Sequence, residues 1–391
     1  MMRPVYIIGV GQTPVMKRQS LRATDMAVQA VSDALAHAHL PKSEVTMLVA
    51  GNMLSGTLDR QRQLATLIAE QADLRGIEAT LVETSCSSGA AAVRHGFMAV
   101  AGGFHDLTVV CGVERMTHAE HADITTALAT ASDWEREGGQ GETFITLNAR
   151  LMRHYMEAYR VDHADFAHFS VNAHRNALHN PHALLHKSIT HEDYMQSRFL
   201  TDPIKLLDAP PICDGAAAVI LATEERAREA QRMGLPVVRV NASTIGTDSL
   251  SLDQRRDVLS LDGAKRSARL AYQQAGMTPA DVDLFELHDA YTVIVALSLE
   301  AAGFAEAGRG VHVGKDGEIT PSGSLPIATM GGLKARGHPV GATGVYQIVE
   351  SFLQLTEQGG VNQVPNAQVA MTQSLGGTGA TVVTHLLSRV G

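Results

Sequence analysis

The sequence predicts an α/β protein made of two related halves, with a mostly helical segment inserted between them. Three observations support this fold class. Strand-like and helix-like segments alternate, their order repeats, and glycine is frequent while aromatic residues are rare (35 glycines, 4% aromatic). At 391 residues the chain exceeds the usual size of one domain. We therefore expect two or three structural units.

The first elements of each half follow the same order. Residues 5–10, VYIIGV, are predicted to form a buried strand, and residues 22–40 a helix whose N-cap we assign to Thr24. A second strand is expected within residues 44–53. Residues 262–292 repeat this order with an alanine-rich helix, a proline turn and a strand. The chain therefore contains two related halves.

A second repeat places a cysteine and a histidine at equivalent positions. CSSGAAAV (86–93) and HPVGATGV (338–345) both have glycine three residues, and valine seven residues, after the first position. Each motif runs into an apolar helix and then into a strand. If the halves pack about a pseudo-twofold axis, Cys86 and His338 lie at equivalent helix N-termini and face one shared site.

The segment between the halves differs in character. Residues 118–206 combine a glycine-rich polar loop with helix-like stretches that are rich in histidine. No HExxH motif occurs and no cysteine accompanies these histidines, so we predict solvated helix surfaces and no metal site. Residues 208–225 return to strand character. We divide the chain into an N-terminal half (1–117 and 207–262), an inserted loop domain (118–206) and a C-terminal half (263–391).

Composition argues against several classes of protein. A formal net charge of −9 argues against binding to nucleic acid. The 3 cysteines are far apart and form no CxxC pair, so neither a disulfide framework nor a zinc site is indicated. The apolar run at the start suits a strand and not a signal peptide, and no stretch approaches the ~20 apolar residues of a membrane helix. We expect a cytoplasmic protein.

Cys86 is the candidate nucleophile. A thiol at a helix N-terminus lies near unpaired backbone N–H groups and the positive end of the helix dipole, so we expect a lowered pKa. Small neighbours would let a substrate approach the sulfur: Ser85, Ser87, Ser88, Gly89, Ala90 and Ala91. The alternative for Cys86 is a buried cysteine on a packed turn. For Cys111, in the middle of a predicted strand, and for Cys213, packing in the core is the favoured interpretation.

The candidate base is in GGLKARGHPVGATG, residues 331–344. Pro339 is expected at the first helical position, and His338 would then be placed to take the proton of a nearby cysteine. A phosphate-binding glycine loop is the alternative interpretation. The pattern GxxxxGK[ST] is absent, so a nucleotide-binding P-loop is disfavoured.

Two further motifs supply candidate site residues. ELHDAYT (286–292) places His288 and Asp289 at a strand end, where active sites of α/β sheets are often found. SLGGTGAT (374–381) is predicted to be a tight turn between two strands, and its backbone N–H groups are candidates for an oxyanion hole.

Together these motifs resemble those of the thiolase superfamily over nearly the whole chain. ETSCSSGAAAV (83–93) resembles the nucleophile block, GHPVGATG (337–344) the histidine block, and DGAAAV (214–219) the strand that leaves the loop domain. The resemblance implies two βαβαβαββ halves stacked as a five-layered α-β-α-β-α core. It also implies a loop domain over the site, a homodimer or homotetramer, and a role in lipid metabolism.

The resemblance further implies acyl-CoA chemistry, with coenzyme A as a substrate and no permanently bound cofactor or metal. Cys86 would be acylated and His338 would deprotonate it. His288 and backbone N–H groups would hold the enolate and thioester oxygens. The oxyanion and substrate contacts would involve Gly376, Gly377, Tyr291 and Asp289.

The sequence departs from the thiolase pattern at the second catalytic thiol. Degradative and biosynthetic thiolases have Asn-Glu where this chain has HDAYT, and a cysteine where it has Ser374. The sterol carrier protein-x type has His-Asp followed by cysteine, and here that residue is Ala290. The α-carbon proton must therefore be handled by His338, His288, Tyr291 or water.

The HDAYT variant is more similar to archaeal acetoacetyl-CoA thiolases and related bacterial proteins. Those proteins often work with a small OB-fold, zinc-ribbon partner, so such a partner is expected. Two alternatives to a thiolase are a retro-aldol lyase acting on CoA-linked side chains, with Tyr291 as base, and a non-catalytic acyl-CoA or lipid carrier. The presence of both Cys86 and His338 favours the thiolase, and the acyl group and the reaction direction stay open.

Overall fold

The computed structural model describes residues 2–17 and 20–390. The strands of its N-terminal half are β1 (Val5–Gln12), β2 (Met47–Gly51), β3 (Glu78–Val82), β4 (Leu107–Glu114) and β7 (Gly215–Thr223). The helices of this half are α1 (Ala23–His37), α2 (Leu64–Gln71), α3 (Ser88–Ala101) and α8 (Glu224–Arg232).

The C-terminal half repeats this order. Its strands are β8 (Val238–Thr247), β9 (Leu284–Glu286), β10 (Val369–Gly376) and β11 (Thr381–Arg389). Its helices are α9 (Asp262–Ala275), α10 (Thr292–Ala301) and α11 (Thr343–Leu355). The strand equivalent to β3 is reduced to an isolated parallel bridge between Phe285 and Ile327. The repeat seen in the sequence is therefore present in the fold, with one strand shortened.

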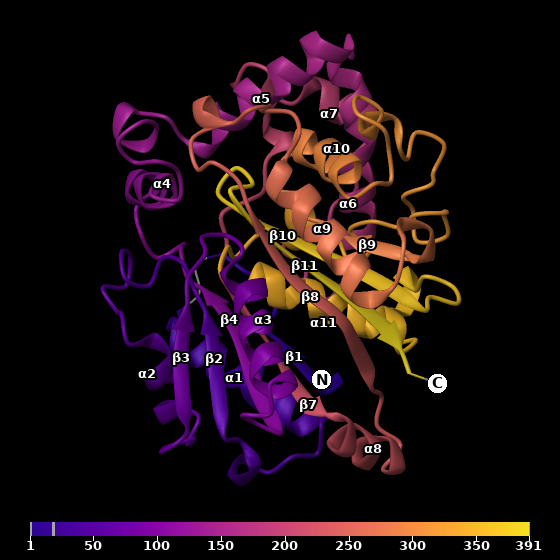
Figure 1. Ribbon diagram of the computed structural model, residues 1–391. Helices are drawn as coiled ribbons and strands as arrows, with labels where there is room; N and C mark the ends of the chain where they lie inside the picture. The colour runs from indigo at the N-terminus through magenta and orange to yellow at the C-terminus, as the bar shows by residue number, and fades with distance from the viewer. Residues whose placement is uncertain (1, 18–19, 391) are drawn as a thin grey trace.

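The strand order makes the relation between the halves visible (Figure 1). In the described residues the strand order is β3-β2-β4-β7-β1-β8-β11-β10-β9. From the centre outward, β1, β7, β4 and β2 of the N-terminal half correspond to β8, β11, β10 and β9 of the C-terminal half. Strands β1 and β8 meet at the centre through short antiparallel pairing, from Val5–Val240 to Ile7–Val238. The arrangement is a pseudo-twofold one, as the sequence repeat predicts.

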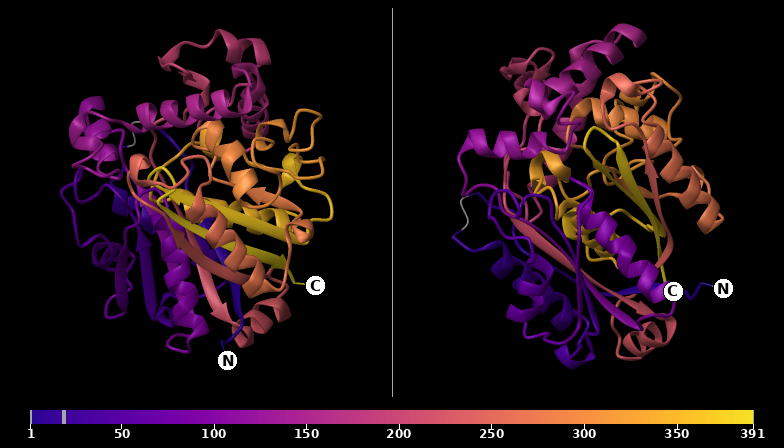
Figure 2. Two further views of the ribbon diagram at one scale, coloured as in Figure 1. Left: turned by 45° about the horizontal axis from the view of Figure 1, so that its top comes forward. Right: turned by 60° about the vertical axis from the view of Figure 1, so that its left-hand side comes forward.

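Helices α3 and α11 form the central layer of the molecule. They pack against each other and against the inner faces of both halves of the sheet, and the layers can be followed in Figures 1 and 2. The core around them includes Val93, Phe97, Ile348 and Phe352. Helices α1 and α2 cover the outer face of the N-terminal half, and α9 and α10 that of the C-terminal half. The predicted five-layered α/β fold is confirmed.

Helix α1 illustrates why these segments become helices. Its buried residues Met26, Ala30 and Ala34 recur every four positions and form one apolar face. The assignment of the N-cap to Thr24 was wrong, because the helix begins at Ala23 and the N-cap is Arg22. The Arg22 backbone N–H donates to the Asp25 carboxylate at 2.9 Å, so the carboxylate supplies the cap.

The inserted segment is mostly helical, as predicted. It contains α4 (His121–Ala129), α5 (Phe144–Tyr159), α6 (Ala167–Ala177), α7 (His191–Gln196), β5 (Phe199–Thr201) and β6 (Ile204–Lys205). Helices α5 and α7 of this segment lie at the top of the view in Figure 1, and α4 lies at the upper left. Buried Asp208 connects it to α10, because its carboxylate accepts hydrogen bonds from the Tyr194 and Thr292 hydroxyls. The domain boundaries given above stay a prediction.

Across residues 2–17 and 20–390, no helix is long and apolar enough to cross a membrane. The same residues contain no group of three or more His, Cys, Asp or Glu side chains arranged to hold a metal ion.

Candidate active site

Cys86 lies on a sharp turn between strand β3 and helix α3. Ser85, the residue before it, has a φ of 55°, a left-handed conformation that non-glycine residues rarely adopt. Two serine hydroxyls hold the turn. Ser87 donates to Thr84 O at 2.7 Å, and Ser88 donates to Ser85 O at 2.6 Å. The turn is thus fixed by its own residues, and Cys86 lines a cavity.

The environment of the Cys86 thiol differs from the expectation. Cys86 is 7% exposed, and burial raises its pKa to about 12, with the charge of Glu114 acting in the same direction. The N–H groups of Cys86 and Gly377 oppose this shift in pKa. The expected lowering of the pKa was therefore wrong, because lost hydration outweighs the helix dipole at a buried thiol. In the resting protein the sulfur carries its proton.

His338 is held through its backbone and its ring. Its N–H donates to Cys213 Sγ at 3.0 Å, and its Nδ1 lies 2.7 Å from Thr343 Oγ1. The Thr343 hydroxyl in turn donates to Pro339 O at 3.2 Å. Because the Thr343 hydroxyl donates its proton to Pro339 O, its oxygen can only accept from His338 Nδ1. Nδ1 therefore carries the imidazole proton, and Nε2 presents a lone pair. In the described chain Nε2 has no hydrogen-bond partner, so it can accept a proton from the cavity.

Pro339 does not occupy the first helical position. Helix α11 begins at Thr343, and Pro339 lies in the turn before it, where Pro339 O accepts from Ala342 N at 2.8 Å and Thr343 N at 3.0 Å. The expectation that Pro339 is the first helical residue was wrong. The Pro339 carbonyl accepts the first hydrogen bond of the helix, so Pro339 precedes the first helical residue, Thr343, by four positions. His338 therefore stands in a loop and not at the helix start.

The starts of α3 and α11 touch, which brings the two loops together. A Cβ on Gly89 would lie 2.7 Å from Gly341 O, and a Cβ on Gly344 would lie 2.3 Å from Ala90 N. Any side chain at Gly89 or Gly344 would therefore push the two helices apart. This contact leaves the preceding loops adjacent, and Cys86 and His338 line the same cavity.

His288 follows strand β9 and faces His338. The two rings meet edge to face with centroids 5.1 Å apart. Burial and the charges of Arg336 and Lys334 lower the pKa of His288 to about 3. Burial, with His288 and Arg336 nearby, places the pKa of His338 well below its ordinary value. Both imidazoles are therefore neutral at physiological pH, and each has one donor and one acceptor nitrogen.

Tyr291 and Asp289 have different surroundings. Tyr291 lines the cavity, and burial with the nearby Cys86 raises its pKa, so its hydroxyl keeps its proton at neutral pH. Asp289 does not reach the cavity. It is 2% exposed, and its Oδ1 accepts from Leu333 N at 2.7 Å. Asp289 supports the segment that leads to His338, and the predicted substrate contact through Asp289 is not present in this geometry.

The glycine turn between β10 and β11 contributes one of its two predicted residues to the cavity. Gly377 lines the cavity, and its backbone N–H acts to lower the pKa of the Cys86 thiol. Gly376 lies behind the turn, where a Cβ would stand 2.3 Å from Thr84 O, and it does not line the cavity. Ser374, at the position where the resemblance leads one to expect a second thiol, is 1% exposed, and its hydroxyl donates to Cys86 O at 3.5 Å.

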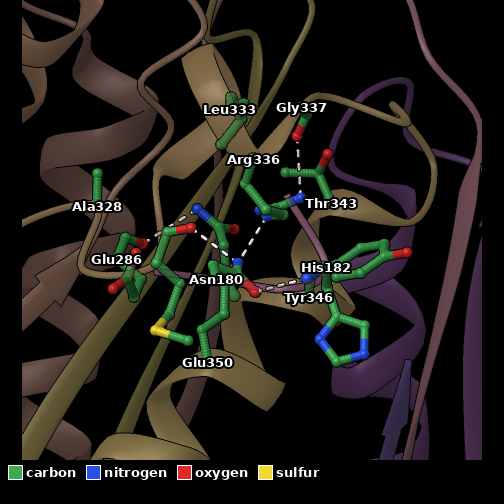
Figure 3. A network of polar contacts seen from close by, with 12 residues as sticks. Asn180, His182, Glu286, Ala328, Leu333, Arg336, Gly337, Thr343, Tyr346 and Glu350 are labelled. Carbon is green, nitrogen blue, oxygen red and sulfur yellow. Dashed lines mark hydrogen bonds and ion pairs between the residues drawn. The ribbon is translucent and has the colours of Figure 1, made fainter. Parts of the chain in front are cut away.

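A buried ion pair between Arg336 and Glu350 lies next to Gly337, the residue before His338; Figure 3 shows Arg336, Glu350 and Gly337. The Arg336 side chain donates from Nε to Glu350 Oε1 at 2.8 Å and from Nη1 to Gly337 O at 3.0 Å. Its guanidinium stands over the Tyr346 ring, 4.7 Å from the centroid. Arg336 and Glu350 are both buried. Gly337, the residue before His338, is therefore hydrogen-bonded by the Arg336 side chain, which in turn pairs with Glu350 of α11.

Glu114, which no sequence motif singled out, connects the two halves near the thiol. Its Oε1 accepts from Asn52 Nδ2 at 2.9 Å and Leu54 N at 3.1 Å. Its Oε2 accepts from Met53 N and Gly341 N, both at 3.0 Å. Burial raises the pKa of Glu114 to about 7 against the opposing effect of these N–H groups. The carboxylate fastens the loop after His338 to the N-terminal half.

The cavity has a volume of about 490 Å³. Of the predicted site residues, it contains Cys86, His288, Tyr291, His338 and Gly377. Much of the remaining lining comes from the inserted segment and its flanks, including Met116, Ile124, Leu128, Phe144, Ile145, Asn148 and Ile212. These residues carry no motif, so the sequence offered no signal for them. Thr343 does lie in the motif GHPVGATG, but its hydrogen bond to His338 depends on the orientation of the His338 ring, which the sequence does not reveal.

Comparison with known proteins identifies the family. Residues 5–225 match the thiolase N-terminal domain, and residues 244–389 match the thiolase C-terminal domain-like family. The chain is 41% identical to an acetyl-CoA acetyltransferase of Methanothermobacter thermautotrophicus, over 99% of this chain and 100% of the relative. It is 31% identical to sterol carrier protein 2 of Oryctolagus cuniculus, over 97% of this chain and 71% of that protein.

Solved structures agree on the fold. The Ltp2-ChsH2(DUF35) aldolase superposes with a TM-score of 0.85, at 23% identity, over 99% of this chain and 98% of that chain. Human mitochondrial 3-ketoacyl-CoA thiolase superposes with a TM-score of 0.77, at 15% identity, over 100% of this chain and 99% of that chain. With both thiolase domains matched and a full-length relative at 41% identity, the chain belongs to the thiolase family of acyltransferases.

Proposed function

We propose that this protein transfers acyl groups between coenzyme A and a 3-oxoacyl-CoA through a thioester on Cys86. The observation that carries the proposal is the meeting of Cys86 and His338, from equivalent loops of the two halves, on one cavity. The relative from Methanothermobacter thermautotrophicus, an acetyl-CoA acetyltransferase, supports the same reaction type. Coenzyme A is a substrate in this proposal.

In the first step the Cys86 sulfur attacks the 3-oxo carbon of the substrate. Because the thiol is protonated at rest, its proton moves to His338 Nε2 as the carbon–sulfur bond forms. The N–H groups of Cys86 and Gly377 face the sulfur, so they are close to the oxygen that becomes negative. Breaking the bond between C2 and C3 leaves an acyl-Cys86 and the enolate of acetyl-CoA.

The enolate must then gain a proton. His288 is neutral and lines the cavity, so its N–H can donate to the enolate oxygen. The proton that His338 took from Cys86 is returned to C2, which completes acetyl-CoA. Ser374 does not line the cavity and takes no part in this transfer. Tyr291 keeps its proton because its pKa is raised, so in the condensing direction it is a poor base.

In the second step coenzyme A attacks the acyl-Cys86 carbonyl. His338 Nε2 takes the proton of the coenzyme A thiol and gives it to the leaving Cys86 sulfur. The products are a shortened acyl-CoA and the free thiol. Every group is reused in the reverse order during condensation, so the geometry supports both directions.

The test is intact-protein mass after incubation with acetyl-CoA and acetoacetyl-CoA, for the wild type and Cys86→Ala. The proposal predicts an acyl adduct on the wild type that is lost in Cys86→Ala, with release of coenzyme A. Turnover that survives in Cys86→Ala would overturn it and favour the retro-aldol lyase, which forms no thioester. Absence of both adduct and turnover, with acyl-CoA binding retained, would favour a carrier.

We also propose a homodimer or homotetramer and a role in lipid metabolism, with membership of the thiolase family as their support, and a cytoplasmic location. A small OB-fold, zinc-ribbon partner is part of the same proposal. Its support is the missing second thiol and the two-component name of the Ltp2-ChsH2(DUF35) aldolase. Co-purification from the native source tests it. Full activity and normal coenzyme A affinity of the chain alone would count against a partner.

A further inference from the structure

The turn between β10 and β11 packs directly on the turn that carries Cys86. A Cβ on Gly376 would lie 2.3 Å from Thr84 O and 2.8 Å from Ser87 Oγ, so the two turns leave no room between them. The next residue, Gly377, lines the cavity beside Cys86, and its backbone N–H acts to lower the pKa of the thiol. The position of this turn therefore decides how the Gly377 N–H stands relative to the nucleophile.

The hydrogen bonds inside this turn do not fix the residues that line the cavity. Gly377 has a φ of 63° and Gly379 a φ of 98°, conformations that glycine enters and leaves at low steric cost. The N–H groups of Gly379 and Ala380 both donate to Gly376 O, at 3.2 and 3.1 Å. Neither of these two hydrogen bonds includes Gly377 or Thr378, which are the turn residues that line the cavity. A contact from outside the turn is needed to hold them.

Arg255 supplies that contact. It lies between β8 and α9, and its side chain is 0% exposed. Its Nη1 donates to Thr378 O at 2.9 Å, and its Nη2 donates to Thr378 Oγ1 at 3.0 Å. The planar guanidinium thus binds the backbone and the side chain of one residue together, which fixes the orientation of that residue. Because Thr378 directly follows Gly377, this pair of hydrogen bonds restrains the part of the turn that faces Cys86.

Arg255 is itself anchored by residues outside the turn. Its Nε donates to Ser249 O at 3.2 Å and lies 3.7 Å from Asp248 Oδ2. Burial lowers the pKa of Arg255, and the charges of Asp248 and Glu137 oppose that shift. Glu137 belongs to the inserted segment, and its Oε1 accepts from Leu252 N at 2.8 Å. The guanidinium is therefore held in place independently of the turn that it binds.

We propose that Arg255 is a positioning residue for the reaction at Cys86, because by holding Thr378 it keeps the Gly377 N–H directed at the reacting group. This proposal rests on the proposed thioester function. When the Cys86 sulfur attacks a carbonyl carbon, the carbonyl oxygen becomes negative, and an N–H that is already in place stabilises it without rearrangement. Arg255 does not line the described cavity, so it acts only through the turn.

The test uses Arg255→Lys, which keeps the buried positive charge and removes the planar pair of donors. Lysine has a single ammonium group, so it cannot bind Thr378 O and Thr378 Oγ1 in the same geometry. It still balances the nearby carboxylates, so the protein should fold, and the midpoint of urea unfolding checks this. Arg256→Lys is the matched control, because this neighbouring arginine makes the same change on a side chain that is 90% exposed.

The first measurement is the single-turnover rate of Cys86 acylation by acetyl-CoA, followed by intact-protein mass. Removing one oxyanion donor costs about 10²–10³-fold in rate, so displacing the donor in Arg255→Lys should slow acylation at least tenfold at saturating acetyl-CoA. The concentration that gives half the maximal rate should change less than threefold, because the lost interaction belongs to the transition state. Arg256→Lys should change both quantities less than twofold. A loss of rate below threefold in Arg255→Lys would overturn the proposal.

Alkylation of Cys86 by iodoacetamide gives a second readout that needs no substrate. The Gly377 N–H favours the thiolate, so its displacement should raise the pKa of the thiol and slow alkylation at pH 9 at least threefold in Arg255→Lys. A general loosening of the protein would instead admit the reagent and speed alkylation. Unchanged or faster alkylation in Arg255→Lys would therefore overturn the proposal.

The outcomes separate the two levels of inference. An acyl adduct that forms equally fast on the wild type and on Arg255→Lys would leave the Cys86 thioester standing and remove the role of Arg255. An absence of any adduct on the folded wild type would remove the thioester function and with it the role of Arg255 in that reaction.

Discussion

The two loops that meet at the active site are held in different ways. In the N-terminal half, the strand β3 ends at Val82, and the turn after it contains Cys86. The hydroxyls of Ser87 and Ser88 hydrogen-bond to the backbone of this turn. In the C-terminal half the matching strand is only the bridge at Ile327, and His338 comes after a longer irregular stretch. Cys86 and His338, which are equivalent in the repeat, are therefore held by different kinds of structure.

The longer stretch is held by partners from distant parts of the chain. It contains a π-helical turn, Gly332–Arg336, whose arginine pairs with Glu350. The inserted segment grips the residues before this turn, because Asn176 Nδ2 donates to Ala328 O at 3.0 Å and Asn180 Nδ2 donates to Met330 O at 2.8 Å. We conclude that local sequence positions the nucleophile, whereas tertiary contacts position the base.

The largest effect is expected from His338→Asn. Removing a general base lowers a rate by about 10²–10⁴-fold, so the rate of Cys86 acylation should fall within that range. Single-turnover release of coenzyme A from acetyl-CoA measures this rate. The midpoint of urea unfolding is the control and should stay close to that of the wild type. A rate within threefold of the wild type would mean that the Cys86 proton leaves by another route.

Removing Glu350 tests the tertiary support of the His338 loop. Glu350→Ala leaves the buried Arg336 charge without its partner, which should lower the free energy of unfolding by about 3–5 kcal/mol. Glu357→Ala is the matched control, because it breaks the exposed pair with Arg389 and should cost about 1 kcal/mol or less. Urea denaturation measures both. Equal losses would show that the buried pair gives the loop no special support.

The raised pKa of Cys86 predicts a steep pH dependence of alkylation. With a pKa of about 12, the reactive thiolate fraction rises about tenfold per pH unit below that value. The rate of modification by iodoacetamide should therefore rise about a hundredfold from pH 7 to pH 9, without a plateau. Mass spectrometry with Cys86→Ala as background measures it. A plateau near neutral pH would restore the low pKa expected from the helix N-terminus.

The contact between the two helix starts predicts a smaller effect on stability. Gly89→Ala puts a methyl group 2.7 Å from Gly341 O, and overpacking of this kind costs about 1–3 kcal/mol. Alanine gains up to about 1 kcal/mol in helix propensity, so the net loss lies toward the lower end. Gly56→Ala is the control, because its Cβ would lie 3.8 Å from Arg62 Cγ. Similar free energies of unfolding for both variants would contradict the tight contact.

Much of the fold and the two central site residues were accessible from the sequence. The two halves share a spacing of glycine and valine after Cys86 and His338, and that spacing is a local property of a helix start. His288 and Gly377 lie in short motifs at strand ends, so their neighbourhood also followed from local pattern. The sheet order then brings these motifs to one cavity.

The sequence was less informative wherever a property depends on distant residues. The pKa of Cys86 is set by burial among residues of other segments, which local pattern does not reveal. Asp289 points into the protein, where its carboxylate accepts a hydrogen bond from Leu333 N. Glu114 and the apolar cavity residues of the inserted segment belong to no motif, since their contacts join separate parts of the chain. These are tertiary effects on burial and orientation.

The smallest effect is expected from substituting Thr343, a residue near His338 in the sequence whose hydroxyl contacts both the His338 ring and Pro339 O. Its hydroxyl lies 2.7 Å from His338 Nδ1 and selects the tautomer in which Nε2 accepts a proton. Thr343→Val keeps the shape and removes the hydroxyl, so the rate of Cys86 acylation should fall about tenfold, the lower end of the loss seen when a residue that orients a metal-binding histidine is removed. Thr343→Ser restores the hydroxyl and should recover most of the rate.

A loss of packing alone would give a different pattern in the Thr343 variants. Serine lacks the methyl group, so a packing role would leave Thr343→Ser as impaired as, or more impaired than, Thr343→Val. A tautomer role predicts the reverse order, with the free energy of unfolding lower in serine and the acylation rate lower in valine. Opposite ranking of stability and rate would therefore show that the short side chain of Thr343, and not the bulk of the loop, directs the His338 lone pair toward the nucleophile.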